Sequence, residues 1–363
     1  MLETVRQILE KTVPDRNDLV TLLSVKSPEA TNLILEKGYQ VKCEGVGKKV
    51  YLRGLIEFSN KCAKDCFYCG IRASNVSVER YSLSEEEVLQ AADFAWKNGF
   101  GSLVIQTGEV SGKRFVDMLE RLLIKIHELT NHELTITLSC GEMPLDVYLR
   151  WKNAGAERYL LRIESSNRDL YYKIHPKNKR HSFENRIEGL KNLQKAGFQV
   201  GTGVMIGLPG QSIEDLADDL LFFKTIDIDM IGMGPYIEHA ETPLYALKDQ
   251  LWSASERFRI SLLMLALARI LMPDINLASS TALETLDPLG RQKGLLAGAN
   301  VVMPNLTPVN SRKKYQLYNN KPNLDKDAAL SAVSLQKVIE VIGEEIAFRE
   351  AGNSKHFHLR TKI

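Results

Sequence analysis

Short apolar runs alternate with amphipathic stretches along most of the chain. The runs have the length of buried strands, and most precede a stretch in which apolar residues recur with the period of a helix packed on a sheet. The expected strands are residues 50–58, 102–106, 134–139, 158–163, 199–206, 230–233, 275–279 and 300–303. The expected helices are residues 84–98, 113–130, 145–153, 183–196, 213–225, 255–271 and 290–297.

Eight strand–helix units in one chain predict an α/β fold, a (β/α)8 TIM-type barrel, in preference to an open sheet. We expect residues 1–48 to form an N-terminal helical segment, with helices over 2–37, and residues 49–313 to form the barrel. Residues 314–363 are expected to be a C-terminal extension that closes the barrel. It combines a polar stretch at 319–327 with a helical pattern that continues to about Arg349.

The composition is that of an ordinary globular protein, with 44% hydrophobic and 25% charged residues. The net charge of +2 gives no strong overall field for nucleic acid or an anionic membrane, although it leaves room for a local patch. No window approaches the roughly 18 apolar residues of a membrane span. The first residues contain no apolar stretch typical of a secretion signal, and five cysteines in so long a chain do not make a disulfide framework. A cytoplasmic location is therefore expected.

Three of the five cysteines lie within eight residues, in the loop after the first predicted strand. Cys62, Cys66 and Cys69 form a C-x3-C-x2-C spacing, and three such thiolates can bind three irons of a cubane and leave the fourth open to a small ligand. A structural zinc site, which would need a fourth ligand nearby, and a chance spacing are the alternatives. Cys43 and Cys140 are interpreted as buried, inert thiols.

This spacing, with Tyr68 directly before the third cysteine, resembles the radical S-adenosylmethionine (SAM) superfamily. The resemblance implies two cofactors, one [4Fe–4S] cluster on the catalytic residues Cys62, Cys66 and Cys69, and SAM on its open iron. By the same resemblance, Glu164 and Arg186 match the positions that hold the ribose and the methionine carboxylate of SAM. The full set of implied SAM-binding residues is Tyr68, Thr107, Gly108, Glu109, Ser139, Glu164, Arg186 and Met230.

Longer runs between about residues 50 and 318 resemble the HydE family of [FeFe]-hydrogenase maturases within this superfamily. The family relation implies reductive cleavage of SAM to a 5′-deoxyadenosyl radical, which attacks the sulfur of a cysteinate–iron complex during assembly of the hydrogenase H-cluster. It also implies a small-molecule substrate, a one-electron donor such as a ferredoxin or flavodoxin, and the other hydrogenase maturases as partners. No nucleic acid or membrane partner is expected.

The same resemblance implies a substrate pocket inside the barrel. Arg162 suits a small anionic ligand, because its guanidinium can bind a carboxylate through two hydrogen bonds. Plain barrel filling, or an ion pair between Arg162 and Glu164 on one face of their strand, is the competing interpretation. The implied substrate-binding residues are Thr137, Arg162, Ser280, Thr281, Met303, Tyr315 and Tyr318.

The segment 315–329, where some relatives carry three further cysteines, contains none, so a single cluster is expected. Two other functions stay open. One is another radical SAM enzyme of the biotin synthase and methylornithine synthase group, acting on a small amino-acid-like substrate. The other is an iron–sulfur carrier, which would not need Glu109, Glu164 or Arg186. His175 and the basic run 177–180 are interpreted as a solvated loop, with a docking surface as the alternative.

Overall fold

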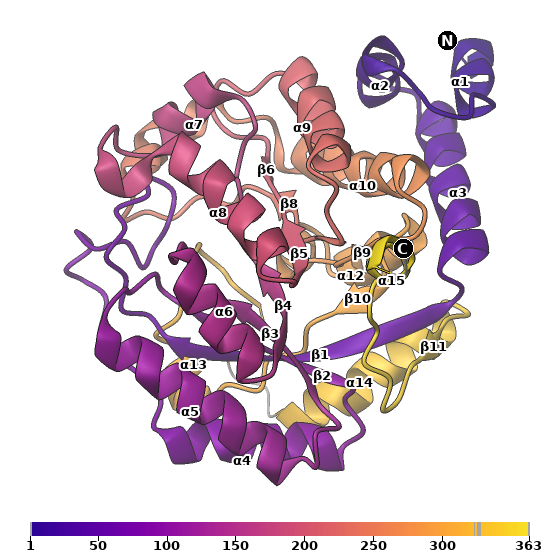
Figure 1. Cartoon of the computed structure of the whole chain (residues 1–363). Helices are drawn as coiled ribbons and strands as arrows, with labels where there is room; N and C mark the ends of the chain where they lie inside the picture. Colours follow the sequence, from indigo (N-terminus) through magenta and orange to yellow (C-terminus); the bar gives the residue numbers. More distant parts are fainter. Residues whose placement is uncertain (1, 323, 325–327, 362–363) are drawn as a thin grey trace.

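Eight parallel strands form the centre of the molecule in the computed structural model, which describes residues 2–322, 324 and 328–361 (Figure 1). Their order is β10-β1-β2-β3-β4-β5-β7-β9, and a bridge between Ala278 and Val301 joins β9 back to β10. The (β/α)8 prediction is confirmed. The strands are β1 (Lys49–Ser59), β2 (Ser102–Thr107), β3 (Thr135–Ser139), β4 (Ala156–Leu160), β5 (Gln199–Thr202), β7 (Met230–Ile231), β9 (Asn276–Leu277) and β10 (Val301–Val302).

Helices cover the outside of these strands, because parallel strands are apolar on both faces and must be buried on both. Local sequence signals set where several of them begin: Ser84 and Glu87 form a capping box at the start of α4, and Ser212 and Asp215 form one at the start of α9. The covering helices are α4 (Glu85–Lys97), α5 (Lys113–Leu129), α6 (Leu145–Asn153), α8 (Phe183–Lys195), α9 (Ile213–Thr225), α10 (Ala254–Leu271) and α12 (Gly290–Leu296).

Several predicted boundaries were wrong. The strand expected over 199–206 divides into β5 and β6 (Met205–Ile206), and β6 pairs with β8 (Gly234–Pro235) in a separate small sheet. Five short elements, none longer than eight residues, escaped prediction because such short segments show little helical periodicity. They are α7 (Arg168–Ile174), η1 (Lys179–His181), η2 (Pro243–Gln250), α11 (Thr281–Leu286) and α13 (Val309–Arg312).

The N-terminal segment contains α1 (Leu2–Leu9), α2 (Arg16–Leu23) and α3 (Pro28–Gly45), so its last helix runs past the expected end at residue 37. The cause is close packing of α3 on α10. A Cβ on Gly38 would lie 2.7 Å from the Cβ of Ala266, so only glycine allows this approach. Arg16 at the start of α2 also forms an ion pair with Asp218 of α9.

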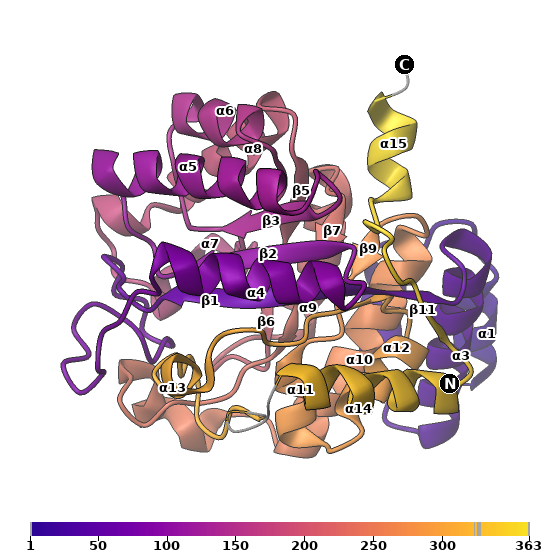
Figure 2. The same cartoon turned by 90° about the horizontal axis from the view of Figure 1, so that it is seen from below.

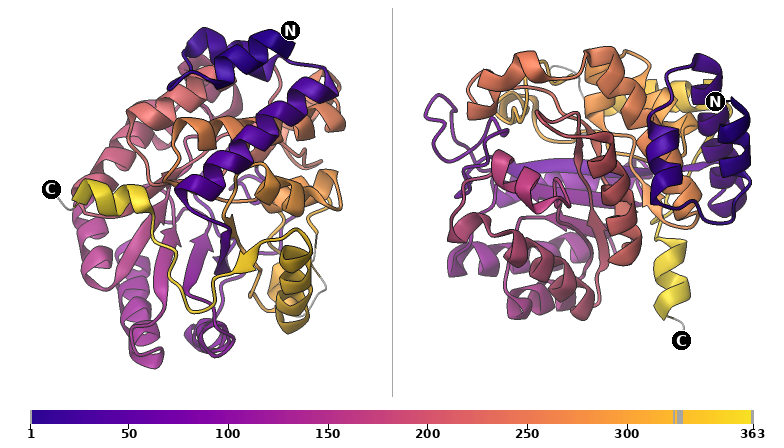
Figure 3. Two further views of the ribbon diagram at one scale, coloured as in Figure 1. Left: turned by 90° about the vertical axis from the view of Figure 1, so that its right-hand side faces the viewer. Right: turned by 90° about the horizontal axis from the view of Figure 1, so that it is seen from above.

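The C-terminal extension departs most from expectation. Of the polar stretch 319–327, residues 323 and 325–327 lie outside the described part of the chain. The helix that follows, α14 (Ala328–Val341), ends well before Arg349, and β11 (Glu345–Ile346) then pairs with β1. Residues 350–354 run across the ends of the strands to α15 (Lys355–Thr361), as Figure 3 (left) shows, and α15 projects from the barrel in Figure 2.

Hydrogen bonds from inside the barrel hold this crossing segment at the amino ends of the strands. Arg53 and Asn276 both donate to the carbonyl oxygen of Gly352, at 3.2 and 2.9 Å, and Arg158 donates to Ala351 and Asn353. The extension therefore closes this end of the barrel. The domain boundaries at 48/49 and 313/314 stay predictions. Within the described ranges, no helix is long and apolar enough to cross a membrane.

Candidate functional site

The three clustered cysteines lie in the loop that follows β1, at the carboxyl end of the barrel. All three line one cavity of about 260 Å³. The loop is held in shape by Arg80, whose guanidinium donates to four backbone carbonyl oxygens, those of Asn60, Ile71, Arg72 and Asn75. The sequence thus places three thiols on a loop that is fixed by hydrogen bonds of its own.

Burial raises the pKa of all three thiols, that of Cys66 to about 12. A buried thiolate is disfavoured without a cation, so these groups are protonated until a metal displaces the protons. Cys140 is also buried, as predicted, and burial raises its pKa to about 12. Cys43 is partly exposed on α3, so the expectation that it is buried was wrong.

The loop after β2 packs directly against the cysteine loop. The backbone N–H of Ala63 donates to the carbonyl oxygen of Glu109 at 2.8 Å. A Cβ on Gly108 would lie 2.3 Å from the carbonyl oxygen of Lys61 and 2.8 Å from the Cβ of Cys62. The two loops can therefore pack this closely, and place Glu109 at the cavity, only with glycine at position 108.

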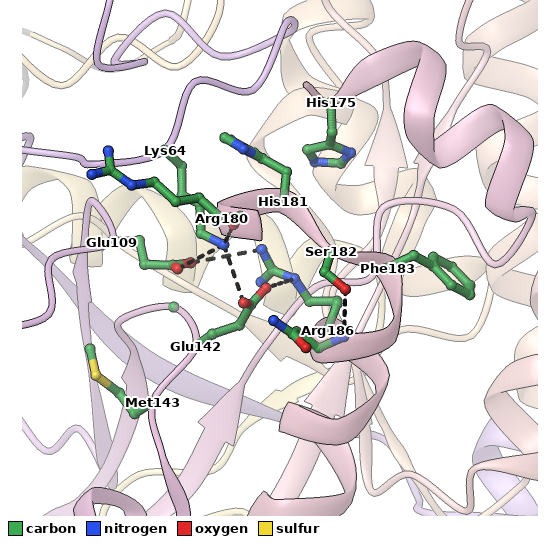
Figure 4. Close-up of polar contacts among 12 residues, drawn as sticks. Lys64, Glu109, Glu142, Met143, His175, Arg180, His181, Ser182, Phe183 and Arg186 are labelled. Carbon is green, nitrogen blue, oxygen red and sulfur yellow. Dashed lines mark hydrogen bonds and ion pairs between the residues drawn. The ribbon is translucent and has the colours of Figure 1, made fainter. Parts of the chain in front are cut away.

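Four charged side chains form a compact group beside the cysteines, which we call the charge cluster: Lys64, Glu109, Glu142 and Arg186 (Figure 4). Lys64 Nζ lies 3.0 Å from Glu109 Oε1 and 3.2 Å from Glu142 Oε2. Arg186 Nε lies 2.7 Å from Glu142 Oε1, and its Nη2 lies 3.7 Å from Glu109 Oε2. The two positive and two negative charges balance, and this pairing offsets the free-energy cost of burying them.

Burial and pairing act in opposite directions on these groups. Burial disfavours a charged guanidinium, but Glu142 and Glu109 outweigh it and raise the pKa of Arg186. Burial raises the pKa of Glu109, opposed by Arg186 and Lys64. Arg186 and Glu109 thus offer a cation and a carboxylate, side by side, to a ligand that carries both a carboxylate and an amine.

The loop after β4 carries Glu164 in a strained conformation, with a φ of +67°. Its backbone N–H donates to Gly203 at 3.0 Å, and its carbonyl oxygen accepts from Met205. Asp219 of α9 fastens the next turn, since the backbone N–H and the hydroxyl of Ser166 both donate to its Oδ1, at 2.7 and 2.6 Å. These bonds hold Glu164 at the cavity wall, where burial raises its pKa.

Tyr68 is fixed by a histidine rather than by solvent. Its hydroxyl lies 3.2 Å from His175 Nε2, and His175 Nδ1 lies 2.9 Å from the carbonyl oxygen of Tyr171. The carbonyl can only accept, so Nδ1 carries the proton and Tyr68 donates to Nε2. Burial lowers the pKa of His175, in keeping with this neutral form. His175 and His181 are both buried, so the interpretation of His175 as part of a solvated loop was wrong, whereas residues 177–180 are exposed as that interpretation expected.

Most of the residues singled out from the sequence meet in the one cavity. On its wall lie Cys62, Cys66, Tyr68, Cys69, Thr107, Gly108, Glu109, Ser139, Arg162, Glu164, Arg186, Ser280, Tyr315 and Tyr318. Arg162 Nη2 lies 3.0 Å from Glu164 Oε2, so the ion pair considered as the competing interpretation is present. It does not use the whole guanidinium, because Arg162 Nε is buried without a hydrogen-bond partner among the described residues.

Four of the singled-out residues lie elsewhere. Met230, Thr137 and Met303 line a cavity of about 30 Å³ inside the barrel, and Met230 Sδ accepts from Arg53 at 3.0 Å. Thr281 lines another cavity, of about 250 Å³, which Met303 also borders. Their roles in binding stay predictions. The methionine that lines the main cavity is Met205.

Sequence reasoning missed Lys64, Glu142, His175 and Asp219. Two weak signals pointed to the first pair: Lys64 stands between two of the clustered cysteines, and Glu142 follows β3, where barrels carry their chemistry. His175 was considered only as part of a solvated loop, and nothing in the sequence marked Asp219, because their partners Tyr68 and Ser166 come from other elements.

The donor set fits the cofactors that the sequence suggested. Three thiols lie in one cavity with a cation, a carboxylate and an aromatic ring, which suit a metal cluster and an aminoacyl nucleoside. The cysteines are the thiolate ligands on the described wall of this cavity. In the described ranges, no three His, Cys, Asp or Glu side chains form a site for a single metal ion.

Comparison with known proteins gives matches over most of the chain. The family model "Radical SAM superfamily" matches residues 56–223. The chain is 39% identical to the [FeFe] hydrogenase maturase subunit HydE of Thermotoga maritima, over 94% of this chain and 95% of that protein. It is 30% identical to the 3-methylornithine synthase of Methanosarcina barkeri, over 80% and 79%. The crystal structure of methylornithine synthase superposes with a TM-score of 0.79 at 24% identity, covering 95% of this chain and 98% of that one, which shows the shared fold.

Proposed function

The chain belongs to the radical SAM superfamily, and from this premise we propose that it acts as a HydE-like maturase on a small, anionic, sulfur-containing substrate during assembly of the [FeFe]-hydrogenase cofactor. One observation carries the proposal. Three cysteines, three members of the charge cluster (Lys64, Glu109 and Arg186) and the Arg162–Glu164 pair all border the same cavity of about 260 Å³. A cofactor on the cysteines and a substrate on Arg162 would therefore share one enclosed space.

Cys62, Cys66 and Cys69 would hold a [4Fe–4S] cluster with one open iron. When bound there with SAM, the cluster would supply one-electron, adenosyl-radical chemistry. Arg186 would bind the methionine carboxylate of SAM, and Glu109 would bind its ammonium group. These contacts would replace some of the ion pairs that Arg186 and Glu109 make within the charge cluster. Glu164 would accept from the ribose hydroxyls, and Tyr68, held by His175, would pack on the adenine.

The substrate end of the cavity carries polar groups that lack partners. Arg162 Nε and Ser280 Oγ are buried without a hydrogen bond in the described structure. An unsatisfied buried donor is costly, so both favour a ligand with acceptor oxygens. Gly234 makes room here, since a Cβ would lie 2.3 Å from Ser280 Oγ. Tyr315, which is 1% exposed, and Tyr318 cover the cavity and would exclude water from the reaction.

The substrate named above is the finer part of the proposal, and its support is the identity of 39% to HydE. The identity of 30% to a 3-methylornithine synthase favours a second candidate, an amino-acid-like substrate on the same Arg162. We further propose a cytoplasmic location, one resident cluster, and a ferredoxin or flavodoxin as electron donor, with the other hydrogenase maturases as partners.

The first test is anaerobic reconstitution, with EPR of the reduced protein before and after SAM is added. We expect one [4Fe–4S]+ signal that changes with SAM, and release of 5′-deoxyadenosine. Cys62→Ala should abolish both, whereas Cys43→Ala should retain both, because Cys43 lies outside the cavity on α3. An EPR signal that does not change when SAM is added would instead favour a carrier of iron–sulfur clusters.

The second test addresses the substrate. A synthetic cysteinate–iron complex with carbonyl and cyanide ligands should increase SAM cleavage by the wild-type protein and be consumed. Arg162→Gln should lose this stimulation while its slow, substrate-free cleavage of SAM remains. Stimulation by an amino acid in place of the iron complex would favour the second candidate.

A further inference from the structure

A short segment after β4 is built onto the cysteine loop. The backbone N–H of Phe67 donates to the carbonyl oxygen of Ile174 at 3.0 Å, and the backbone N–H of Asp65 donates to His181 Nε2 at 2.8 Å. Lys64 Nζ donates to the carbonyl oxygen of Arg180. Three bonds therefore fix residues 174–181 against the loop that carries the three cysteines.

This segment presents three exposed cations, Lys177, Lys179 and Arg180. Within the described structure none of the three forms an ion pair, although Lys177 lies over the ring of Tyr172. In Figure 4 the side chain of Arg180 points away from the carboxylates of the charge cluster. These cations therefore face solvent with their charge uncompensated.

One of these cations, Arg180, lies beside the loop that carries the three cysteines. Arg180 Nη1 is within 3.5 Å of the carbonyl oxygen of Ala63, the residue that follows Cys62, and both Ala63 and Lys61 are exposed. Asp65, a carboxylate of the same loop, is occupied by Arg72 at 2.8 Å and by Ser74. We define the basic rim as Lys61, Lys177, Lys179 and Arg180.

We propose that the basic rim is the docking surface for an acidic one-electron carrier protein, an inference that rests on the proposed function. The carrier gives up one electron and the cluster gains it, with no bond made or broken. With a net charge of only +2, the chain has no global field to attract such a partner, so a local patch must do so. Electron-transfer encounters are small and transient, and charge complementarity sets their rate.

The test uses the reconstituted protein and an acidic flavodoxin, photoreduced and mixed in a stopped-flow instrument while the absorbance of the cluster is followed. The rim variant is Lys177→Glu/Lys179→Glu. It spares Arg180, whose backbone binds Lys64. The control is Lys195→Glu/Lys224→Glu, which makes the same change of net charge in the last turns of α8 and α9, at the opposite end of the barrel.

At low salt we expect the rim variant to lower the second-order rate of reduction about tenfold and to flatten its salt dependence, with the control near the wild-type rate. Reduction by photoreduced deazariboflavin, a small neutral reductant, and the iron content should not change. Chemical shifts of labelled flavodoxin, titrated with each apoprotein, give a second readout that needs no cluster. Equal losses in both variants, or none in either, would overturn the proposal. SAM cleavage driven by deazariboflavin tests the proposed function separately.

Discussion

At the scale of single residues, a carboxyl outside the cavity helps to shape it. Asp219 is 0% exposed, accepts two hydrogen bonds from Ser166 through Oδ1, and keeps Oδ2 without a partner among the described residues. Burial raises its pKa from an ordinary 3.8 to about 7. The folded state therefore holds this proton more tightly than the unfolded state does.

The pH dependence follows from that difference. Between about pH 4 and 7 the folded protein binds the proton and the unfolded chain does not, so the contribution of Asp219 to stability falls as the pH rises, by at most about 1.4 kcal/mol per pH unit. Asp219→Asn keeps an oxygen for both Ser166 bonds and removes the titration. We expect the free energy of unfolding in urea to decrease more between pH 5 and pH 8 for the wild type than for Asp219→Asn. Parallel losses would contradict the assignment.

A second residue prediction concerns the charge cluster. Glu142→Gln leaves two buried cations, Lys64 and Arg186, facing one carboxylate, and should reduce the free energy of unfolding by about 3 kcal/mol. The control is Glu188→Gln on the same helix as Arg186, which breaks an ion pair with Lys195 that is more than half exposed and should cost under about 0.5 kcal/mol. Chemical denaturation of the apoproteins measures both. Similar losses of unfolding free energy in the two variants would show that the charge cluster contributes no more to stability than an exposed ion pair does.

At the scale of elements, the contact between the loops after β1 and β2 depends on Gly108. Gly108→Ala would force a Cβ to within 2.3 Å of the Lys61 carbonyl, so the cysteine loop must shift. We expect the iron bound after reconstitution to fall several-fold while the circular dichroism stays that of the wild type. Gly112→Ala is the matched control from the same connection, since nothing lies within 4 Å of a Cβ there. Full iron loading of Gly108→Ala would refute the argument.

At the scale of the whole molecule, the C-terminal helix is held to the barrel by charge, because no residue of α15 is buried. His356 Nδ1 lies 3.2 Å from Asp274 and its Nε2 lies 2.6 Å from Asp227, and Arg360 pairs with Asp227 and Asp229. These contacts anchor the segment that crosses the amino end of the barrel.

Asp274 and Asp227 raise the pKa of His356 from 6.5 to about 9, against the effect of burial. Its stabilisation is therefore complete below about pH 6.5 and is lost as the pH rises through 9. His356→Gln should lower stability by about 1–2 kcal/mol at pH 6 and by almost nothing above pH 9.5. His358→Gln, on the exposed side of the same helix, should show no such change. Unfolding curves at the two pH values measure this difference, and a pH-independent effect of His356→Gln would contradict the assigned ion pairs of His356 with Asp274 and Asp227.

The sequence by itself determined the alternation of strands and helices, the barrel, the three-cysteine loop and most of the residues on the cavity wall. Each of these follows from the spacing of nearby residues or from the period of the hydrophobic positions. Tertiary structure alone decided which distant groups meet: Tyr68 with His175, 107 residues apart, Ser166 with Asp219, 53 apart, and Arg158 with Asn353, 195 apart. It also moved Met230 and Thr137 away from the main cavity, although their strands were predicted. The physical reason is that a pattern along the chain fixes which side of a strand is buried, whereas the partners met there are set by how all eight strands curl around one axis.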